Sequence, residues 1–134
     1  MKALAYPAVI MEDKNGTSEW KFLVNVPDFG IYTEGRDLAD AIEMARDAIG
    51  AMGISMQDKG KELPKAGAVK ADPDYQGLTT YVDVDFETYR KENDMKAVRK
   101  NCTIPSYLNA KAEREGINFS QVLQEALIAK LGLA

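Results

Sequence analysis

The 134-residue chain contains no histidine. Histidine is the commonest general base near neutral pH and the commonest transition-metal ligand in proteins. Any serine or cysteine nucleophile therefore lacks the histidine partner that usually activates it. The composition argues against catalysis, and we expect no catalytic residue, no metal ligand and no cofactor.

Cysteine and long apolar runs are equally scarce. The single Cys102 cannot form an internal disulfide, which fits a reducing compartment. The chain has no apolar run of transmembrane length, and residues 1–7 are too short a segment for a signal peptide. Because 46% of the residues are apolar and 28% are charged, the balance is that of an ordinary globular protein. We expect a cytoplasmic protein without membrane contact.

The net charge of −4 is unevenly distributed along the chain. Residues 1–94 hold 11 Lys and Arg against 18 Asp and Glu, a net charge of −7, whereas residues 95–134 hold 6 against 3, a net charge of +3. A basic C-terminal part suits a phosphate backbone, and dimerisation would double its charge. The acidic part suits a basic protein partner, although acidic residues can also serve solubility alone.

The first 94 residues predict an α+β domain with an antiparallel meander. Trp20, Phe22, Val24 and Val26 alternate with more polar residues, the period of a strand with one buried face, and we expect Trp20 in the core. In the predicted strand over 78–86, the side chains of Val82 and Val84 should point inward. Strands are predicted over 2–11, 20–26, 30–34 and 78–86.

A helix is predicted between the third and fourth strands. Asp37 is a good N-cap, and Asp40 favours the first turn electrostatically. Gly50 and Gly53 weaken the C-terminal half, and the Pro- and Gly-containing segment 61–77 is predicted to be a loop. The apolar stripe of this helix comprises Leu38, Ala41, Ile42, Ala45, Ala48, Ile49 and Met52.

The C-terminal third predicts one short strand over 98–105 followed by helices over 106–115 and 117–131. In the strand, Val98, Cys102 and Ile104 share one face with Lys100, while Arg99, Asn101 and Thr103 share the other. One short strand cannot bury its own apolar face. The pattern therefore implies pairing with a second copy, which would bury Cys102, although a helical hairpin ending an ordinary domain remains an alternative.

The face formed by Arg99, Asn101 and Thr103 is chemically suited to base edges, because Arg can bind guanine and Asn can bind adenine through two hydrogen bonds. The segment from Val98 to Leu131 resembles the ribbon-helix-helix DNA-binding module of the MetJ/Arc repressor class. The resemblance implies that these three residues, six, four and two positions before Pro105, read bases. It also implies that the start of the second helix binds a DNA phosphate. The matching residues there are Asn118, Phe119 and Ser120.

The order of motifs over nearly the whole chain resembles the HicB antitoxin family. The motifs are Tyr6-Pro7-Ala8, Val26-Pro27-Asp28-Phe29, Thr33-Glu34-Gly35, the alanine-rich start of the first helix and the final segment 117–127. This resemblance implies a partial RNase H-like toxin-binding domain over 1–94 and a ribbon-helix-helix domain over 95–134. It implies an antitoxin that inhibits a HicA-type mRNA-cleaving toxin and represses its own operon as a homodimer or higher oligomer.

An RNase H-like body invites an enzyme hypothesis, which the carboxylates do not support. RNase H chemistry needs several carboxylates converging on metal ions. The strand over 2–11 contains none, Asp28 lies in a turn, and Asp83 and Asp85 alternate with inward valines. We therefore expect a binding scaffold rather than an enzyme.

Two functions remain open at this point. In one, the chain is the antitoxin just described; in the other, it is a ribbon-helix-helix transcriptional regulator whose N-terminal domain senses a small molecule. No toxin-contact residue can be identified from the sequence. The candidates are Phe29, Tyr32, Glu34, Asp83 and Asp85.

Overall fold

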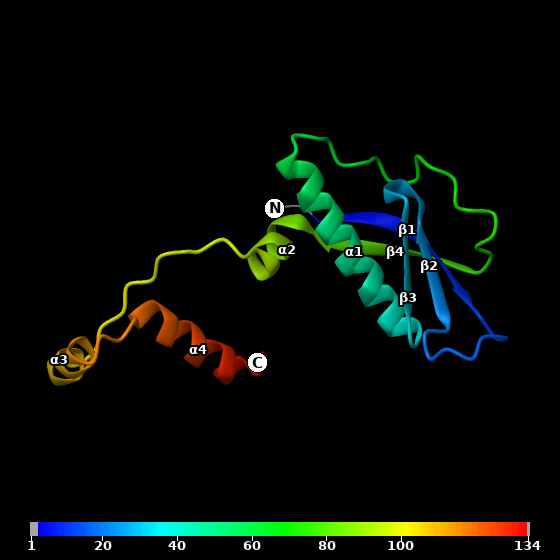
Figure 1. Cartoon of the computed structure of the whole chain (residues 1–134). Coiled ribbons are helices and arrows are strands. Elements are labelled where there is room, and N and C mark those ends of the chain that lie inside the picture. Colours follow the sequence, from blue (N-terminus) through cyan, green and yellow to red (C-terminus); the bar gives the residue numbers. More distant parts are fainter. Residues whose placement is uncertain (1–2, 134) are drawn as a thin grey trace. The chain divides into compact units, whose positions relative to one another are not determined.

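The structure is a computed structural model that describes residues 3–133 and divides into two compact units, Met1–Met95 and Lys96–Ala134 (Figure 1). We call them the N-terminal unit and the C-terminal unit and describe each by itself. Among the described residues, no helix is both long enough and apolar enough to span a membrane.

The N-terminal unit is a four-stranded antiparallel sheet with the strand order β3-β2-β1-β4. One long helix, α1, crosses one face of this sheet (Figure 1). The predicted α+β class and the predicted order of three strands, a helix and a fourth strand are confirmed. The element bounds are β1 Ala3–Glu12, β2 Phe22–Val26, β3 Ile31–Gly35, α1 Leu38–Asp58 and β4 Leu78–Asp85, with a single 3-10 turn, η1 Pro27–Phe29, between β2 and β3.

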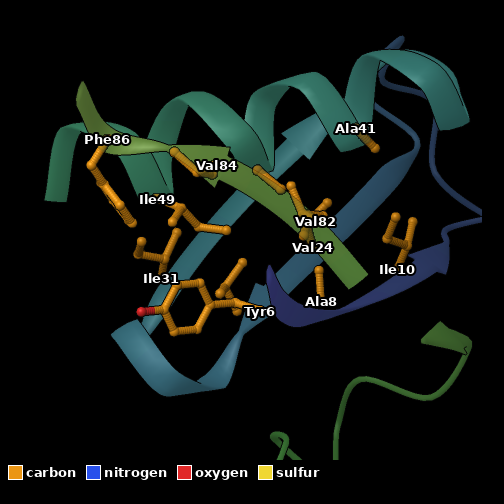
Figure 2. Packing of buried hydrophobic residues seen from close by; sticks show 12 residues of the cluster. Tyr6, Ala8, Ile10, Val24, Ile31, Ala41, Ile49, Val82, Val84 and Phe86 are labelled. Carbon is orange, nitrogen blue, oxygen red and sulfur yellow. The ribbon is translucent and has the colours of Figure 1, made fainter. Parts of the chain in front are cut away.

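The hydrophobic core lies between α1 and the sheet (Figure 2). Alternate residues in the middle of β1, Tyr6, Ala8 and Ile10, enter it, as the period of a strand requires. The predicted inward orientation of Val82 and Val84 is confirmed, because both are buried. The strands contribute Tyr6, Ala8, Ile10, Val24, Val26, Ile31, Val82 and Val84, and the helices contribute Ala41, Ala45, Ile49 and Phe86.

Helix α1 begins as predicted, because the Asp37 carboxylate accepts a 2.7 Å hydrogen bond from the backbone N–H of Asp40. The predicted apolar stripe is wrong at its two ends. Leu38 is 40% exposed and Met52 is 42% exposed, while Gly50 and Gly53 are buried instead. The helix also continues through both glycines to Asp58.

A second helix, α2 (Phe86–Asn93), explains why α1 has glycine at positions 50 and 53. A Cβ at Gly50 would collide with the ring of Tyr89, and one at Gly53 would collide with the ring of Phe86. The two glycines therefore allow α2 to pack closely against α1. Their cost in helix propensity is offset by this contact.

Trp20 is not part of the core, contrary to the prediction. It precedes β2 and is half-buried, and the guanidinium carbon of Arg36 lies 5.1 Å from the centre of its ring. The arginine covers one ring face through a cation–π contact. Trp20 thus lies near the start of β2 and the end of β3, outside the core.

The C-terminal unit consists of helices α3 (Ser106–Arg114) and α4 (Phe119–Leu131), close to the predicted bounds. Gly116 separates them with a φ of +68°, in the left-handed region that favours glycine. Asn118 then caps α4.

We predict that Gly53→Ala lowers the free energy of unfolding by about 1–3 kcal/mol, because the added methyl group overpacks the contact with Phe86. Urea denaturation measures this change. Helix propensity alone predicts the opposite sign, a gain of up to about 1 kcal/mol. As a control, Ala51→Gly at an exposed position of α1 measures how much an alanine–glycine exchange changes the free energy of unfolding through helix propensity alone. A stabilised Gly53→Ala variant would contradict the packing account.

Candidate DNA-binding and protein-binding sites

The segment expected to read DNA, residues 98–105, has no regular secondary structure in the single chain. The strand predicted over 98–105 is therefore not formed there. A strand needs a neighbouring strand for its hydrogen bonds, so pairing with a second copy remains a prediction. Arg99, Asn101 and Thr103 are all exposed.

The two faces of this segment nevertheless differ in their surroundings. A depression of about 300 Å³ within the C-terminal unit is lined by every second residue of the segment, Lys100, Cys102 and Ile104. Arg99, Asn101 and Thr103 alternate with these lining residues and take no part in the depression. Its other lining residues are Asn109, Phe119, Ser120 and Leu123.

Cys102 is exposed in the described chain, which corrects the expectation that it is buried. Cys102 lines the depression described above, and no other part of the described chain covers it. Burying Cys102 requires a further protein surface over the 100–104 segment.

The start of α4 has the geometry expected of an anion-binding helix terminus. Asn118 caps the helix, and its side-chain oxygen accepts a 3.1 Å hydrogen bond from the backbone N–H of Gln121. Phe119 and Ser120 follow in the first turn, and both are exposed. Free N–H groups and the helix dipole at such a terminus favour a phosphate.

The helices of the C-terminal unit have no buried residue at all. Their apolar side chains recur at helical spacing yet stay open to solvent. An apolar surface of this extent marks an interface, and a unit of this size rarely supports its own core. The large exposed apolar residues from α3 to the end of α4 are Tyr107, Leu108, Ile117, Phe119, Val122, Leu123, Leu127, Ile128 and Leu131.

Two of the predicted toxin contacts have structural roles in the N-terminal unit. The Phe29 ring packs edge-on against the buried Tyr6, with ring centres 4.7 Å apart. The Asp85 carboxylate caps α2 and accepts hydrogen bonds from the backbone N–H groups of Glu87 and Thr88. We therefore do not retain Phe29 and Asp85 as contact candidates.

The other three candidates are exposed. Tyr32 and Glu34 lie on β3, and Asp83 lies on the edge strand β4. Asp83 forms an ion pair of 3.1 Å with Arg46 of α1, and the hydrogen bond from this arginine lowers the pKa of the carboxyl group. Its charge is therefore partly neutralised by the protein itself.

The loop over 61–77 is fixed to the sheet by side chains that the sequence did not single out. Asn25, only 2% exposed, accepts a 3.0 Å hydrogen bond from the backbone N–H of Asp72. The carboxylate of Asp28 accepts another, of 2.9 Å, from the N–H of Gly67. The strand pattern placed Asn25 on the face away from the core, and its burial beneath the loop was not predicted.

Two further aromatic residues bear on the site, Tyr75 of this loop and Tyr81 of β4. Tyr75 packs against Tyr32 with ring centres 5.4 Å apart, and the Tyr32 hydroxyl donates a 2.8 Å hydrogen bond to Asp72. That hydrogen bond is the main reason why the pKa of Tyr32 is raised. Tyr81, 65% exposed, alternates with Val82, and the alternation of β4 could have identified it as outward-facing.

The arrangement of these residues suits binding rather than catalysis. Across residues 3–133, no three His, Cys, Asp or Glu side chains are grouped so that they could hold a metal ion. The candidate contacts instead form an aromatic and acidic surface on one unit and, on the other, an exposed polar segment and a helix terminus.

Comparison with known proteins gives consistent matches. Residues 6–130 match the family described as the HicB-like antitoxin of bacterial toxin–antitoxin systems. A protein of Haemophilus phage HP1, described as an uncharacterized 14.9 kDa protein of the rep–hol intergenic region, is 30% identical over 110 residues. That alignment covers 78% of this chain and 76% of the phage protein.

Two solved structures resemble the chain. One is a chain of a toxin–antitoxin complex from Streptococcus pneumoniae, with a TM-score of 0.60, 23% identity and coverage of 96% of this chain and 99% of that one. The other is the antitoxin HicB of Burkholderia pseudomallei, with a TM-score of 0.49, 23% identity and coverage of 98% of both chains. At this level of identity, the first match supports a shared fold.

The family match spans nearly the whole chain and includes both units. Its members are antitoxins and not enzymes, which agrees with the absence of histidine and of a catalytic carboxylate cluster in the sequence. The chain belongs to the HicB-like antitoxin family of bacterial toxin–antitoxin systems.

Proposed function

We propose that this antitoxin binds and inhibits a HicA-type mRNA-cleaving toxin in the cytoplasm and represses its own operon by binding operator DNA. The N-terminal unit, a partial RNase H-like scaffold, holds the toxin. The C-terminal unit forms a ribbon-helix-helix dimer on DNA. The observation that carries this proposal is the family match over residues 6–130, which includes both units.

The dimer is supported by the uncovered apolar surface of α3 and α4. A second copy supplies the strand that the 98–105 segment lacks, and the two copies can cover each other's apolar helices. Dimerisation would bring the net charge of the DNA-binding part to twice the +3 of residues 95–134. Two phosphate-binding helix termini then flank one antiparallel ribbon.

The exposed side chains of the ribbon provide the base readout. Arg99 and Asn101 can each form two hydrogen bonds with one base, and Thr103 adds a hydroxyl and a methyl group. The alternating residues Lys100, Cys102 and Ile104 already face the helices in the single chain. The segment can therefore pair as a ribbon and present Arg99, Asn101 and Thr103 to the major groove without turning over.

The N-terminal unit is suited to a basic protein partner and not to DNA. Residues 1–94 carry a net charge of −7, which repels a phosphate backbone and attracts a nucleic-acid-binding toxin. The antitoxin family match extends over this unit, so we do not retain the alternative of a small-molecule sensor.

The two activities should be separable. We expect residues 1–95 alone to restore growth in cells that express the toxin, because this unit contains the whole hydrophobic core and the acidic surface. Residues 96–134 alone should not restore growth. Failure of a soluble, folded 1–95 fragment to bind the toxin would place the inhibitory surface in the C-terminal unit.

Readout residues should affect DNA binding only. Replacing Arg99 or Asn101 with Ala should cost about 1–3 kcal/mol of operator binding per lost bidentate contact and relax the preference at one base pair. A mobility-shift assay against operator variants measures both effects. Lys130→Ala on α4, outside the strand, is the matched control. Unchanged affinity and preference in the Arg99/Asn101 double variant would exclude the strand as the reader.

A further inference from the structure

One face of the N-terminal sheet has no helix over it. Residues that pair across antiparallel strands lie on the same face, so the register identifies this face by residue. Pro7 pairs with Tyr81, Met11 pairs with Leu23, and Leu23 pairs with Glu34. These residues alternate with the core residues that meet α1. We call this surface the open sheet face.

The centre of the open sheet face is buried at Val9 and Asn25, and Asn25 is bonded to the 61–77 loop. The rest of the face is unusually apolar for a surface in contact with water. An antiparallel sheet with one solvated side normally alternates apolar residues inside with polar residues outside. Here Pro7, Met11 and Leu23 are half-buried on the outer side, and Tyr32 and Tyr81 are 58% and 65% exposed. Exposed aromatic side chains of this kind are typical anchors of protein interfaces.

The aromatic residues at one side of this face are held in place. Tyr32 packs against Tyr75, and its hydroxyl is bonded to Asp72. The backbone of Asp72 is in turn fixed by the buried Asn25. Because the rings are already positioned, a partner would not have to order them on binding.

The charged residues within the strand bounds on the open sheet face have one sign, while the loop bonded to this face also carries Lys61, Lys65 and Lys70. All charged residues that the strands place on it are acidic, namely Glu34, Asp83 and Asp85. Asp83 is paired with Arg46 and Asp85 caps α2, whereas Glu34 has no ion pair among residues 3–133. A second copy of this acidic unit would meet like charge, and a basic protein would meet opposite charge.

We propose that the open sheet face is the surface on which the toxin docks, with Tyr32, Tyr75 and Tyr81 contacting apolar and cationic side chains and Glu34 facing a lysine or arginine. Arginine stacks readily on tyrosine rings, so a basic nucleic-acid-binding surface suits this face. The inference rests on the proposed antitoxin function and adds the location of the contact.

The test uses the full-length chain and a purified HicA-type toxin, with affinities from isothermal titration calorimetry. Tyr32→Ala and Tyr81→Ala should each weaken binding about tenfold or more, as truncation of an aromatic anchor does. Tyr32→Phe keeps the ring and should bind within about threefold of the wild type. Thermal unfolding of each variant shows that the fold is retained.

Charge is tested with a matched pair. Glu34→Lys reverses a charge on the open sheet face, and Glu92→Lys makes the same change on α2, where the side chain is also exposed. We expect Glu34→Lys to weaken toxin binding at least about tenfold more than Glu92→Lys, because only the first places like charges in contact. Equal effects of the two variants would show only a general charge effect and overturn the proposal.

The outcomes separate this inference from the proposed function. If the wild-type chain does not bind the toxin, the antitoxin proposal fails and this inference with it. If the wild type binds but the tyrosine variants bind equally well, only the docking surface is wrong. If Tyr81→Ala instead lowers the oligomeric state in sedimentation while toxin binding persists, a second copy covers this face and the inference is overturned.

Discussion

The apolar side chains of α3 and α4 have no cover within the described chain, and the organisation of the protein depends on this constraint. A unit without buried residues lacks the apolar burial that offsets the loss of chain entropy on folding. In the proposed dimer, a second copy would cover these side chains. The same contact would supply a partner strand for residues 98–105, bring two helix termini to one DNA site and double a weak positive charge.

The N-terminal unit is built differently, because its core is complete within one chain. Helix α1 covers one side of the sheet. Helix α2 packs closely against α1 at Gly50 and Gly53. The other side of the sheet has no helix over it, and the 61–77 loop is bonded to part of it at Asn25. An acidic unit with its own core, joined to a unit that is proposed to dimerise, would give the proposed antitoxin a physical basis for two separable binding activities.

Much of the fold followed from periodicity and capping. Alternation in β4 and the Asp37 and Asn118 caps located elements correctly because these signals are local. The errors came from tertiary contacts. Trp20 alternates in phase with core residues but meets Arg36 instead, and Gly53 was read as a helix breaker because its neighbour Phe86 is distant in sequence. The anchoring of the 61–77 loop by Asn25 was likewise not predictable from local pattern.

The central claim, that the C-terminal unit depends on a second copy and the N-terminal unit does not, is tested most directly by hydrogen–deuterium exchange of the full chain at several protein concentrations. On dilution, the amides of α4 should lose protection as dimers dissociate, while those of β1 should keep theirs. Protection of α4 that equals that of β1 and does not change with concentration would contradict the account.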